Sequence, residues 1–356
     1  MRQQHFDVIK NSYSSFQKFL FPGKIIKING DLEKDLTNNL SDGKSAVIYD
    51  KYVRSIFIKK ANVNIFDEEI MFNGECCPEE FRRVFLILKE RKIRNLVAAG
   101  GGKVLDVAKH VKKELPEIRL INVPTSAATC AAFTPVSVIY NKDGSYLNTL
   151  DTVPPDILII DYEFFMDLPL AFFAAGIMDT LSKFYETETF YKNEKEKKFC
   201  DNFTRDLAFI LKKNIFKRVK KNKKCLNDED RLFFTDCNII YSGMISCVGI
   251  KTVTSSIAHA IAHAMTIVPK AREYLHGEHV SVSLLIQEQL MENKKNVDDI
   301  ETITGKIDMP DRLSRAGIST EEINLLCSRY FQIKQDEKIY VPVDDNLMYN
   351  VMEKRL

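Results

Sequence analysis

Four of the six histidines in this 356-residue chain fall between positions 259 and 279. His259 and His263 are four residues apart, so they share one face of a predicted helix. His276 and His279 follow after a break at Pro269. Neutral imidazole is the commonest metal ligand in proteins. A helix-borne histidine and a second one from the next segment can therefore bind a divalent ion.

A carboxylate would complete three protein ligands and leave one coordination position open, as in catalytic metal sites. Asp179 is the candidate, because it lies at the predicted start of a helix within the otherwise apolar segment 176–180. From the residues alone, the alternative is a set of buried, hydrogen-bonded structural histidines.

The run Gly100-Gly101-Gly102-Lys103 is the second candidate site, between a predicted strand over 95–99 and a predicted helix over 103–115. Glycines let the backbone approach an anion, and the free N–H groups of the first helical turn point toward it. A Walker A loop has Ser or Thr where Val104 stands, and a Rossmann fingerprint has Gly where Leu105 stands. The run therefore predicts either a phosphate cradle of another type or an ordinary strand-to-helix turn.

Alternating strand and helix patterns up to residue 161 predict an α/β domain with a doubly wound, mostly parallel sheet. Ligands of such sheets bind at the carboxyl ends of the strands, where the glycine run and Thr125 both fall. Long helical patterns follow from residue 162, so we expect an α/β domain over 1–161 and an all-α domain over 162–356. The predicted strands are 24–28, 45–49, 69–72, 95–99, 119–123 and 156–160, with a helix over 78–92 and a hairpin of 136–140 and 146–148.

Composition excludes several classes of partner. The net charge of +2 gives no reason to expect nucleic acid, and the lysine-rich stretches 192–198 and 212–224 are predicted to be solvated helix faces. No apolar run reaches the roughly 18 residues of a membrane span. The eight cysteines include no C-x-x-C pair, which indicates reduced thiols and a cytoplasmic location.

Four segments in this order resemble the glycerol dehydrogenase family, within the metal-dependent (group III, iron-containing) alcohol dehydrogenases. They are GGGKVLDVAK (100–109), PTSAATCAAFTPVSVIYNKDG (124–144), GIMDTLSKFYE (176–186) and HAIAHAMTIVPKAREYLHGEHV (259–280). The resemblance runs from about Phe21 to Gln287. It implies the two-domain architecture shared with dehydroquinate synthase, a homo-oligomer, and an active site in the cleft between the domains.

The resemblance also implies residue roles. The first domain would bind NAD or NADP, and the second would hold one divalent metal, zinc in the glycerol enzymes and iron in some relatives. The implied metal ligands are Asp179, His259 and His276. The implied cofactor contacts are Gly101, Gly102, Lys103 and Asp106 for the pyrophosphate and ribose, Asp50 for the adenosine ribose, and Thr125, Thr134, Val136 and Tyr140 beside the nicotinamide.

Asp50 favours NAD, because a carboxylate after the second strand accepts the free ribose hydroxyls and repels the phosphate of NADP. Lys51 beside it, and the NADP use of the hydroxycarboxylate branch of the family, argue in the other direction.

Three departures from glycerol dehydrogenases bear on the substrate. Cys130 stands where those enzymes carry an aspartate that touches the polyol, and a thiol is a weaker hydrogen-bond acceptor than a carboxylate. Segment 127–135 resembles the hydroxycarboxylate dehydrogenase branch, which reduces 2-oxo acids. Ala262-His263 replaces the His-Asn pair of the family, which adds an imidazole near the metal site as an additional base, a substrate donor or a core residue. We therefore expect Cys130 and His263 to contact substrate, with His263 pairing to an acid group.

The resulting expectation is a metal-dependent NAD(P)-linked oxidoreductase that acts on a small polyol or hydroxy acid, with 2-oxo acid reduction as the alternative to glycerol oxidation. A non-redox enzyme like dehydroquinate synthase is a more distant alternative, since a glutamate is usual there in place of Asp179. A catalytically silent binding protein is disfavoured, because the ligand set and the cofactor loop are both intact.

Overall fold

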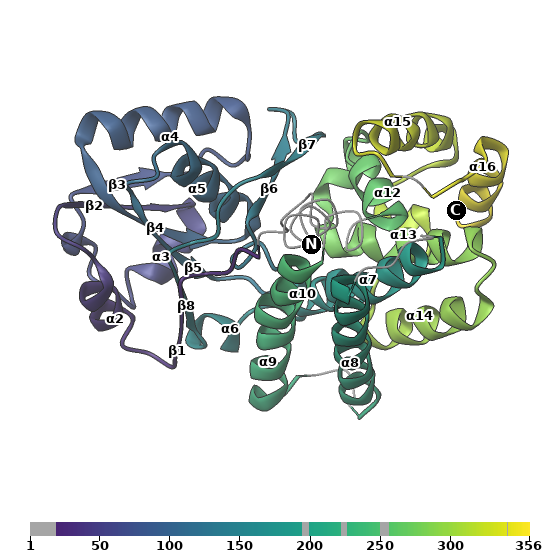
Figure 1. The fold of residues 1–356 in the computed structure, drawn as a ribbon, viewed down its shortest axis with the longest axis horizontal. Coiled ribbons are helices and arrows are strands. Elements are labelled where there is room, and N and C mark those ends of the chain that lie inside the picture. Colours follow the sequence, from purple (N-terminus) through teal and green to yellow (C-terminus); the bar gives the residue numbers. More distant parts are fainter. Residues whose placement is uncertain (1–18, 194–198, 222–225, 250–255, 340) are drawn as a thin grey trace, which may run out of the picture.

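The computed structural model describes residues 19–193, 199–221, 226–249, 256–339 and 341–356. Figure 1 shows a strand-containing half, built from the first part of the chain, beside a half made of helices. The predicted α/β fold followed by a helical region is confirmed.

Six parallel strands form the main sheet, in the spatial order β1-β8-β5-β4-β2-β3. All the predicted strands are present, and the second hairpin strand is longer than predicted. The sheet strands are β1 (Lys24–Ile28), β2 (Lys44–Tyr49), β3 (Glu68–Met71), β4 (Ile93–Gly100), β5 (Arg119–Pro124) and β8 (Ile157–Asp161), and the antiparallel hairpin is β6 (Val136–Tyr140) with β7 (Tyr146–Asp151).

The central strands are buried along their length, including 46–49 of β2, 95–100 of β4 and 157–161 of β8. Such continuous apolar runs belong to parallel strands that are covered on both faces. The chain leaves β2 toward β3 at the sheet edge but leaves β4 toward β5 in the opposite direction. The order of strands therefore reverses between β2 and β4, and this is where sheets of this type bind ligands.

The helices of this half connect the strands, except for α6, which follows the last strand. Helix α5 buries Val104, Val107, Ala108 and Val111, the residues whose helical spacing predicted it. The elements are α2 (Leu32–Asn39), α3 (Lys51–Phe57), the 3-10 turn η1 (Val63–Ile65), α4 (Pro78–Arg91), α5 (Gly102–Glu114) and α6 (Glu163–Met166).

After β8 the described chain is helical, and the predicted domain division at residues 161 and 162 stays a prediction. No helix in the described ranges is both long and apolar enough to span a membrane. The elements are α7 (Leu170–Asn193), α8 (Phe199–Lys221), α9 (Asp228–Thr235), the π-helical segment η2 (Asp236–Tyr241), α10 (Ser242–Val248), α12 (Ile257–Met265), η3 (Lys270–Glu273), α13 (His276–Leu290), α14 (Lys294–Ile307), η4 (Leu313–Ala316), η5 (Thr320–Glu322), α15 (Ile323–Asp336) and α16 (Asp345–Lys354).

Parts of both lysine-rich stretches, 194–198 and 222–224, lie outside the described residues. Within α8, the prediction of a solvated face is wrong for Lys212. Its ammonium lies over the rings of Phe184 and Tyr185 and 3.3 Å from a carboxylate oxygen of Asp299. The aliphatic stem of a lysine can cover apolar surface in this way while its charge keeps a partner.

The last part of the chain supports the histidine-bearing helices. Residues of α15 and α16, among them Leu326, Tyr330 and Met352, share a buried apolar cluster with Ile261 and Met265 of α12. Helix α12 is apolar on all sides except for its histidines, which is the pattern of a helix buried inside a protein. The C-terminal helices therefore complete the core that holds His259 in place.

Candidate active site

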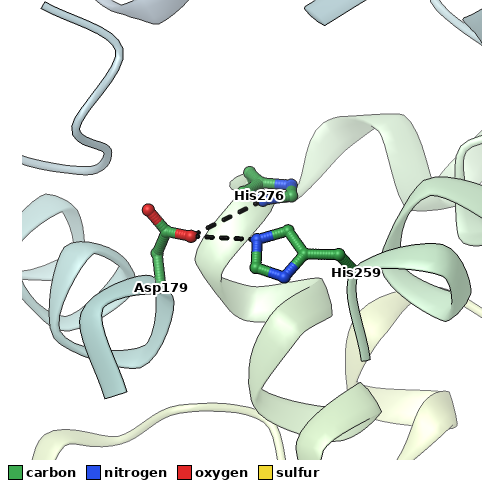
Figure 2. Close-up of side chains that lie close together, drawn as sticks. All are labelled: Asp179, His259 and His276. Atoms are coloured by element: carbon green, nitrogen blue, oxygen red, sulfur yellow. Dashed lines mark hydrogen bonds and ion pairs between the residues drawn. The ribbon is translucent and has the colours of Figure 1, made fainter. Parts of the chain in front are cut away.

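Asp179, His259 and His276 converge on one point (Figure 2). The Oδ1 atom of Asp179 lies 3.3 Å from Nε2 of His259 and 3.9 Å from Nε2 of His276, and the three ligand atoms all lie within 4.8 Å of one another. Two atoms bound to one zinc at about 2.1 Å in tetrahedral geometry are about 3.4 Å apart. The 3.9 Å separation is too long for a hydrogen bond. The donor set and its spacing therefore suit a divalent metal.

The position of Asp179 in its helix corrects the sequence prediction. Asp179 lies in the middle of α7, which starts at Leu170 directly after Pro169, and not at a helix start. Gly176 lies inside the same helix. A Cβ at Gly176 would lie 1.9 Å from the carbonyl oxygen of Ala127, so this glycine serves the close approach of the loop that follows β5.

A second close approach brings His276 to Asp179. His276 is the first residue of α13, and Gly277 follows it. A Cβ at Gly277 would lie 1.9 Å from the carbonyl oxygen of Ala175 in α7. The missing side chain therefore lets the start of α13 rest directly on α7, one turn before Asp179.

Glu186 holds His259 from behind. This carboxylate is fully buried, and its Oε2 lies 2.7 Å from Nδ1 of His259. Its Oε1 accepts hydrogen bonds from the backbone N–H groups of Ser256 and His259, at 2.8 and 3.1 Å. A carboxylate at Nδ1 keeps the proton there and leaves the Nε2 lone pair free for a metal, as is common for metal-binding histidines.

The charges in the cluster favour an ionised Asp179 and at least one neutral histidine. Burial opposes the charge of Asp179, but Lys183 and the two imidazoles outweigh it and hold its pKa well below the usual range. Burial also opposes the charged form of His259, but the carboxylates of Glu186 and Asp179 raise its pKa to about 9. Desolvation lowers the pKa of His276 to about 3, so its imidazole is neutral at physiological pH.

The other two clustered histidines have different surroundings. The ring of His263 stacks on Tyr146, with centroids 4.0 Å apart, and lies 5.6 Å from the ring of His276. His279 is buried, and its Nε2 lies 2.8 Å from the carbonyl oxygen of Ala271. Burial lowers the pKa of His279 to about 4. His263 therefore borders the metal cluster, and His279 holds the turn before α13.

The glycine run forms the start of α5, with Gly101 as the N-cap and Gly102 as the first helical residue. A Cβ at Gly101 would meet only the Ser126 Cβ, at 3.9 Å, so packing within the protein does not require a glycine there. The N–H of Thr125 donates to the carbonyl oxygen of Gly100 at 3.1 Å and joins the ends of β4 and β5. The open helix N-terminus leaves room for an anionic group such as a pyrophosphate.

Asp50 and Lys103 flank this helix start. Asp50 follows β2 directly and caps α3, because its Oδ1 accepts the N–H of Val53 at 2.7 Å. The Lys103 ammonium lies 2.6 Å from Glu75 and 4.9 Å from the centre of the Tyr140 ring. The acidic and basic groups expected to touch the cofactor thus line the same cleft as the open helix end.

Asp106 and Lys109 connect α5 to the hairpin. Asp106 lies 2.9 Å from the ammonium of the fully buried Lys109 and accepts the N–H of Val138 at 2.9 Å. Lys109 donates to the carbonyl oxygens of Thr134 and Val136. The contacts of Asp106 are therefore with the chain itself, and they hold in place the wall that carries Thr134 and Val136.

One cleft of about 2200 Å³ contains the two predicted sites. It is lined from both halves of the molecule, so the cofactor side and the metal cluster face the same space. Every predicted site residue lines it: Asp50, Gly101, Gly102, Lys103, Asp106, Thr125, Cys130, Thr134, Val136, Tyr140, Asp179, His259, His263 and His276.

Cys130 lies in the wall of this cleft between the two sites. It is largely buried, and its sulfur lies 4.0 Å from the hydroxyl oxygen of Ser246. Burial raises the pKa of this thiol, so it is neutral at physiological pH. This position, at which the resemblance implies an aspartate in glycerol dehydrogenases, is uncharged here.

Sequence reasoning missed three residues of the site. Lys183 and Glu186 follow Asp179 by four and seven residues, which is the spacing of one helix face, so the pattern could have indicated them. Asn238 carries no such signal. Its side chain, from η2, donates to the carbonyl oxygens of Ala127 and Phe173 and links the loop after β5 to α7.

Comparison with known proteins agrees with this arrangement. A family model described as iron-containing alcohol dehydrogenase matches residues 36–162. Glycerol dehydrogenase of Thermotoga maritima is 26% identical over 84% of this chain and 84% of its own length. This chain is therefore similar to iron-containing alcohol dehydrogenases in its α/β part and to glycerol dehydrogenases over most of its length. Hydroxycarboxylate dehydrogenase A of Escherichia coli is 27% identical over 63% of each chain.

Solved structures share the fold. A probable glycerol dehydrogenase from Sinorhizobium meliloti 1021 superposes with a TM-score of 0.82 at 22% identity, covering 95% of this chain and 97% of the other. Sulfoacetaldehyde reductase from Bifidobacterium kashiwanohense, in complex with NAD+, gives a TM-score of 0.73 at 18% identity, covering 96% and 99%. These solved structures therefore share the complete α/β and helical architecture of this chain.

Proposed function

We propose that this protein is a metal-dependent, NAD-linked oxidoreductase that interconverts a small hydroxy compound and its carbonyl form. One observation carries the proposal. The cluster of Asp179, His259 and His276 and the open N-terminus of α5 line the same cleft. An oxidoreductase that uses a metal and a nicotinamide cofactor needs the metal site and the cofactor site in one cleft. The reacting carbon must meet the nicotinamide while the metal polarises the substrate oxygen.

In this proposal Asp179, His259 and His276 hold one divalent metal. Two imidazoles and one carboxylate suit both zinc and ferrous iron, and the resemblance to the glycerol enzymes favours zinc. A divalent metal bound there would act as a Lewis acid on the substrate oxygen, and the nicotinamide would give or take the hydride. Glu186 keeps the Nδ1 proton of His259 in place. The cleft walls orient the substrate and exclude water around it.

The preference for NAD rests on Asp50, which lies at the end of β2 beside the switch point of the sheet. One of its oxygens caps α3, and a carboxylate at this position suits the free ribose hydroxyls of NAD. The NAD+ complex of the structurally similar sulfoacetaldehyde reductase supports the same cofactor.

For the substrate we propose a 2-oxo acid, reduced to its 2-hydroxy acid, over glycerol. The neutral, buried thiol of Cys130 offers a polyol hydroxyl no charge-assisted hydrogen bond, and it does not repel a carboxylate. The similarity to hydroxycarboxylate dehydrogenase A supports this substrate class, and the similarity to glycerol dehydrogenases supports the polyol alternative.

A substrate panel tests the proposal. NADH absorbance at 340 nm would be followed with zinc-loaded protein and 2-oxo acids, neutral carbonyls, or glycerol with NAD. We expect 2-oxo acids to be reduced more efficiently than glycerol is oxidised. Cys130→Asp should shift that ratio toward glycerol. A ratio unchanged by Cys130→Asp would remove Cys130 from the argument.

A further inference from the structure

Lys183 is a buried cation directly beside the metal cluster. It follows Asp179 by one turn of α7, and its ammonium lies 3.6 Å from Oδ1 of Asp179. Its side chain is 7% exposed, and it lines the cleft together with Cys130 and the clustered histidines. Lysine is almost never this buried unless a partner compensates its charge.

Asp179 alone is an incomplete partner for this cation. The oxygen nearest to Lys183 is Oδ1, the same atom that faces both histidines. When Asp179 serves a metal, its negative charge is shared with a divalent cation. Removing a buried charge from its partner is costly, so the bound state favours a further anion close to Lys183.

The charges around the cluster lead to the same conclusion. In the described part of the chain, the carboxylates that act most strongly on Lys183 are those of Asp179 and Glu186. Two carboxylates, one ammonium and one divalent metal leave a single net positive charge. A neutral polyol would leave that charge uncompensated, whereas a monoanionic substrate would cancel it.

We propose that Lys183 binds the carboxylate of a 2-oxo acid substrate. This assignment rests on the proposed function and gives its substrate site a specific anion-binding residue. The carboxylate of a 2-oxo acid is one bond away from the reacting carbonyl, so its partner must lie next to the metal ligands, as Lys183 does. His263, expected from the sequence to fill this role, stacks on Tyr146 instead.

Cys130 and Lys183 act together in this arrangement. Both residues line the same cleft beside Asp179. The thiol removes the repulsion that an aspartate would exert on an anion, and the ammonium adds an attraction. Selectivity between charged and neutral substrates then comes from both an absent repulsive group and a present attractive one.

The test compares pyruvate with pyruvamide, its neutral isostere, in zinc-loaded wild-type, Lys183→Gln and Lys183→Arg proteins. We expect Lys183→Gln to lower kcat/KM for pyruvate about 10- to 100-fold, the range of one lost hydrogen bond to a charged group. Pyruvamide reduction should change less than about threefold, and Lys183→Arg should retain most of the pyruvate preference because it keeps the charge. Lys192→Gln, at an exposed site near the end of α7, is the matched control.

Calorimetry with oxamate, an unreactive 2-oxo acid analogue, gives a readout besides turnover. Its binding to zinc-loaded protein with NADH should weaken in Lys183→Gln by the same factor as pyruvate kcat/KM. Equal losses for pyruvate and pyruvamide, unchanged oxamate binding, or a wild type that prefers pyruvamide would overturn the assignment. The proposed function fails by a different result, namely that the zinc-loaded wild-type protein reduces none of the tested carbonyl compounds with NADH.

Discussion

Glu186 gives the sharpest prediction about how the metal site is built. Its two oxygens serve three buried donors: Oε1 takes two backbone N–H groups, and Oε2 takes Nδ1–H of His259. Glu186→Gln keeps the shape but leaves only one acceptor oxygen. If the amide NH2 faced the backbone, two buried N–H donors would lose their partner, at about 1–3 kcal/mol each.

The amide NH2 is therefore expected to face His259. Nδ1 would then have to accept a hydrogen bond, and the imidazole proton would move to Nε2, the atom that faces Asp179. Loss of such an outer partner typically weakens metal binding about 10- to 100-fold, equivalent to about 1.4–2.7 kcal/mol. We expect Glu186→Gln to fall in this range.

Zinc affinity would be measured by competition with a chromophoric chelator, at constant pH and with circular dichroism as the check on folding. Glu188→Gln is the matched control, since Glu188 lies on the same helix but pairs with Arg205 away from the cluster. Wild-type zinc affinity in a folded Glu186→Gln protein would refute the reasoning.

Three further predictions concern the supports of the site. Gly277→Ala should lower both the zinc affinity and the thermal stability, because the new Cβ would lie 1.9 Å from the Ala175 carbonyl oxygen and push His276 away from Asp179. A normal zinc affinity in this variant would show that the helix contact does not position His276. Asp50→Asn should keep the α3 cap but reduce the ratio of kcat/KM with NADH to kcat/KM with NADPH. A wild-type kcat/KM that is more than about tenfold higher with NADPH than with NADH would contradict the role of Asp50. Asn238→Ala should lower the melting temperature, since two buried carbonyl oxygens lose their donor at a cost of about 1–3 kcal/mol, and an unchanged melting temperature would remove Asn238 from the account.

The sheet could be predicted from the sequence because its central strands are buried on both faces and therefore read as short apolar runs between turns. The run 95–99 became β4, and the glycine run became the start of α5. The order of the strands in the sheet could not be predicted from the sequence, because it depends on pairing between residues far apart in the chain.

The metal cluster was readable only in part. The spacing of His259 and His263 indicated a shared helix face, but it could not say that His263 would stack on Tyr146, more than 100 positions earlier. The prediction of Asp179 at a helix start was wrong, because α7 continues through Gly176, where the missing side chain allows a close approach of Ala127. Glu186 and Lys183 had the correct spacing from Asp179, but spacing alone does not reveal which face of a buried helix borders a cleft.

The direct test of the account is whether turnover depends on a metal held by Asp179, His259 and His276. The purified protein would be stripped with a chelator, its metal content measured by elemental analysis, and NADH oxidation followed at 340 nm before and after zinc is restored. We expect activity to disappear with the metal and to return with about one zinc per chain, whereas His276→Ala should stay folded and gain no activity on zinc addition. Full activity in a protein shown to be free of metal would contradict the account.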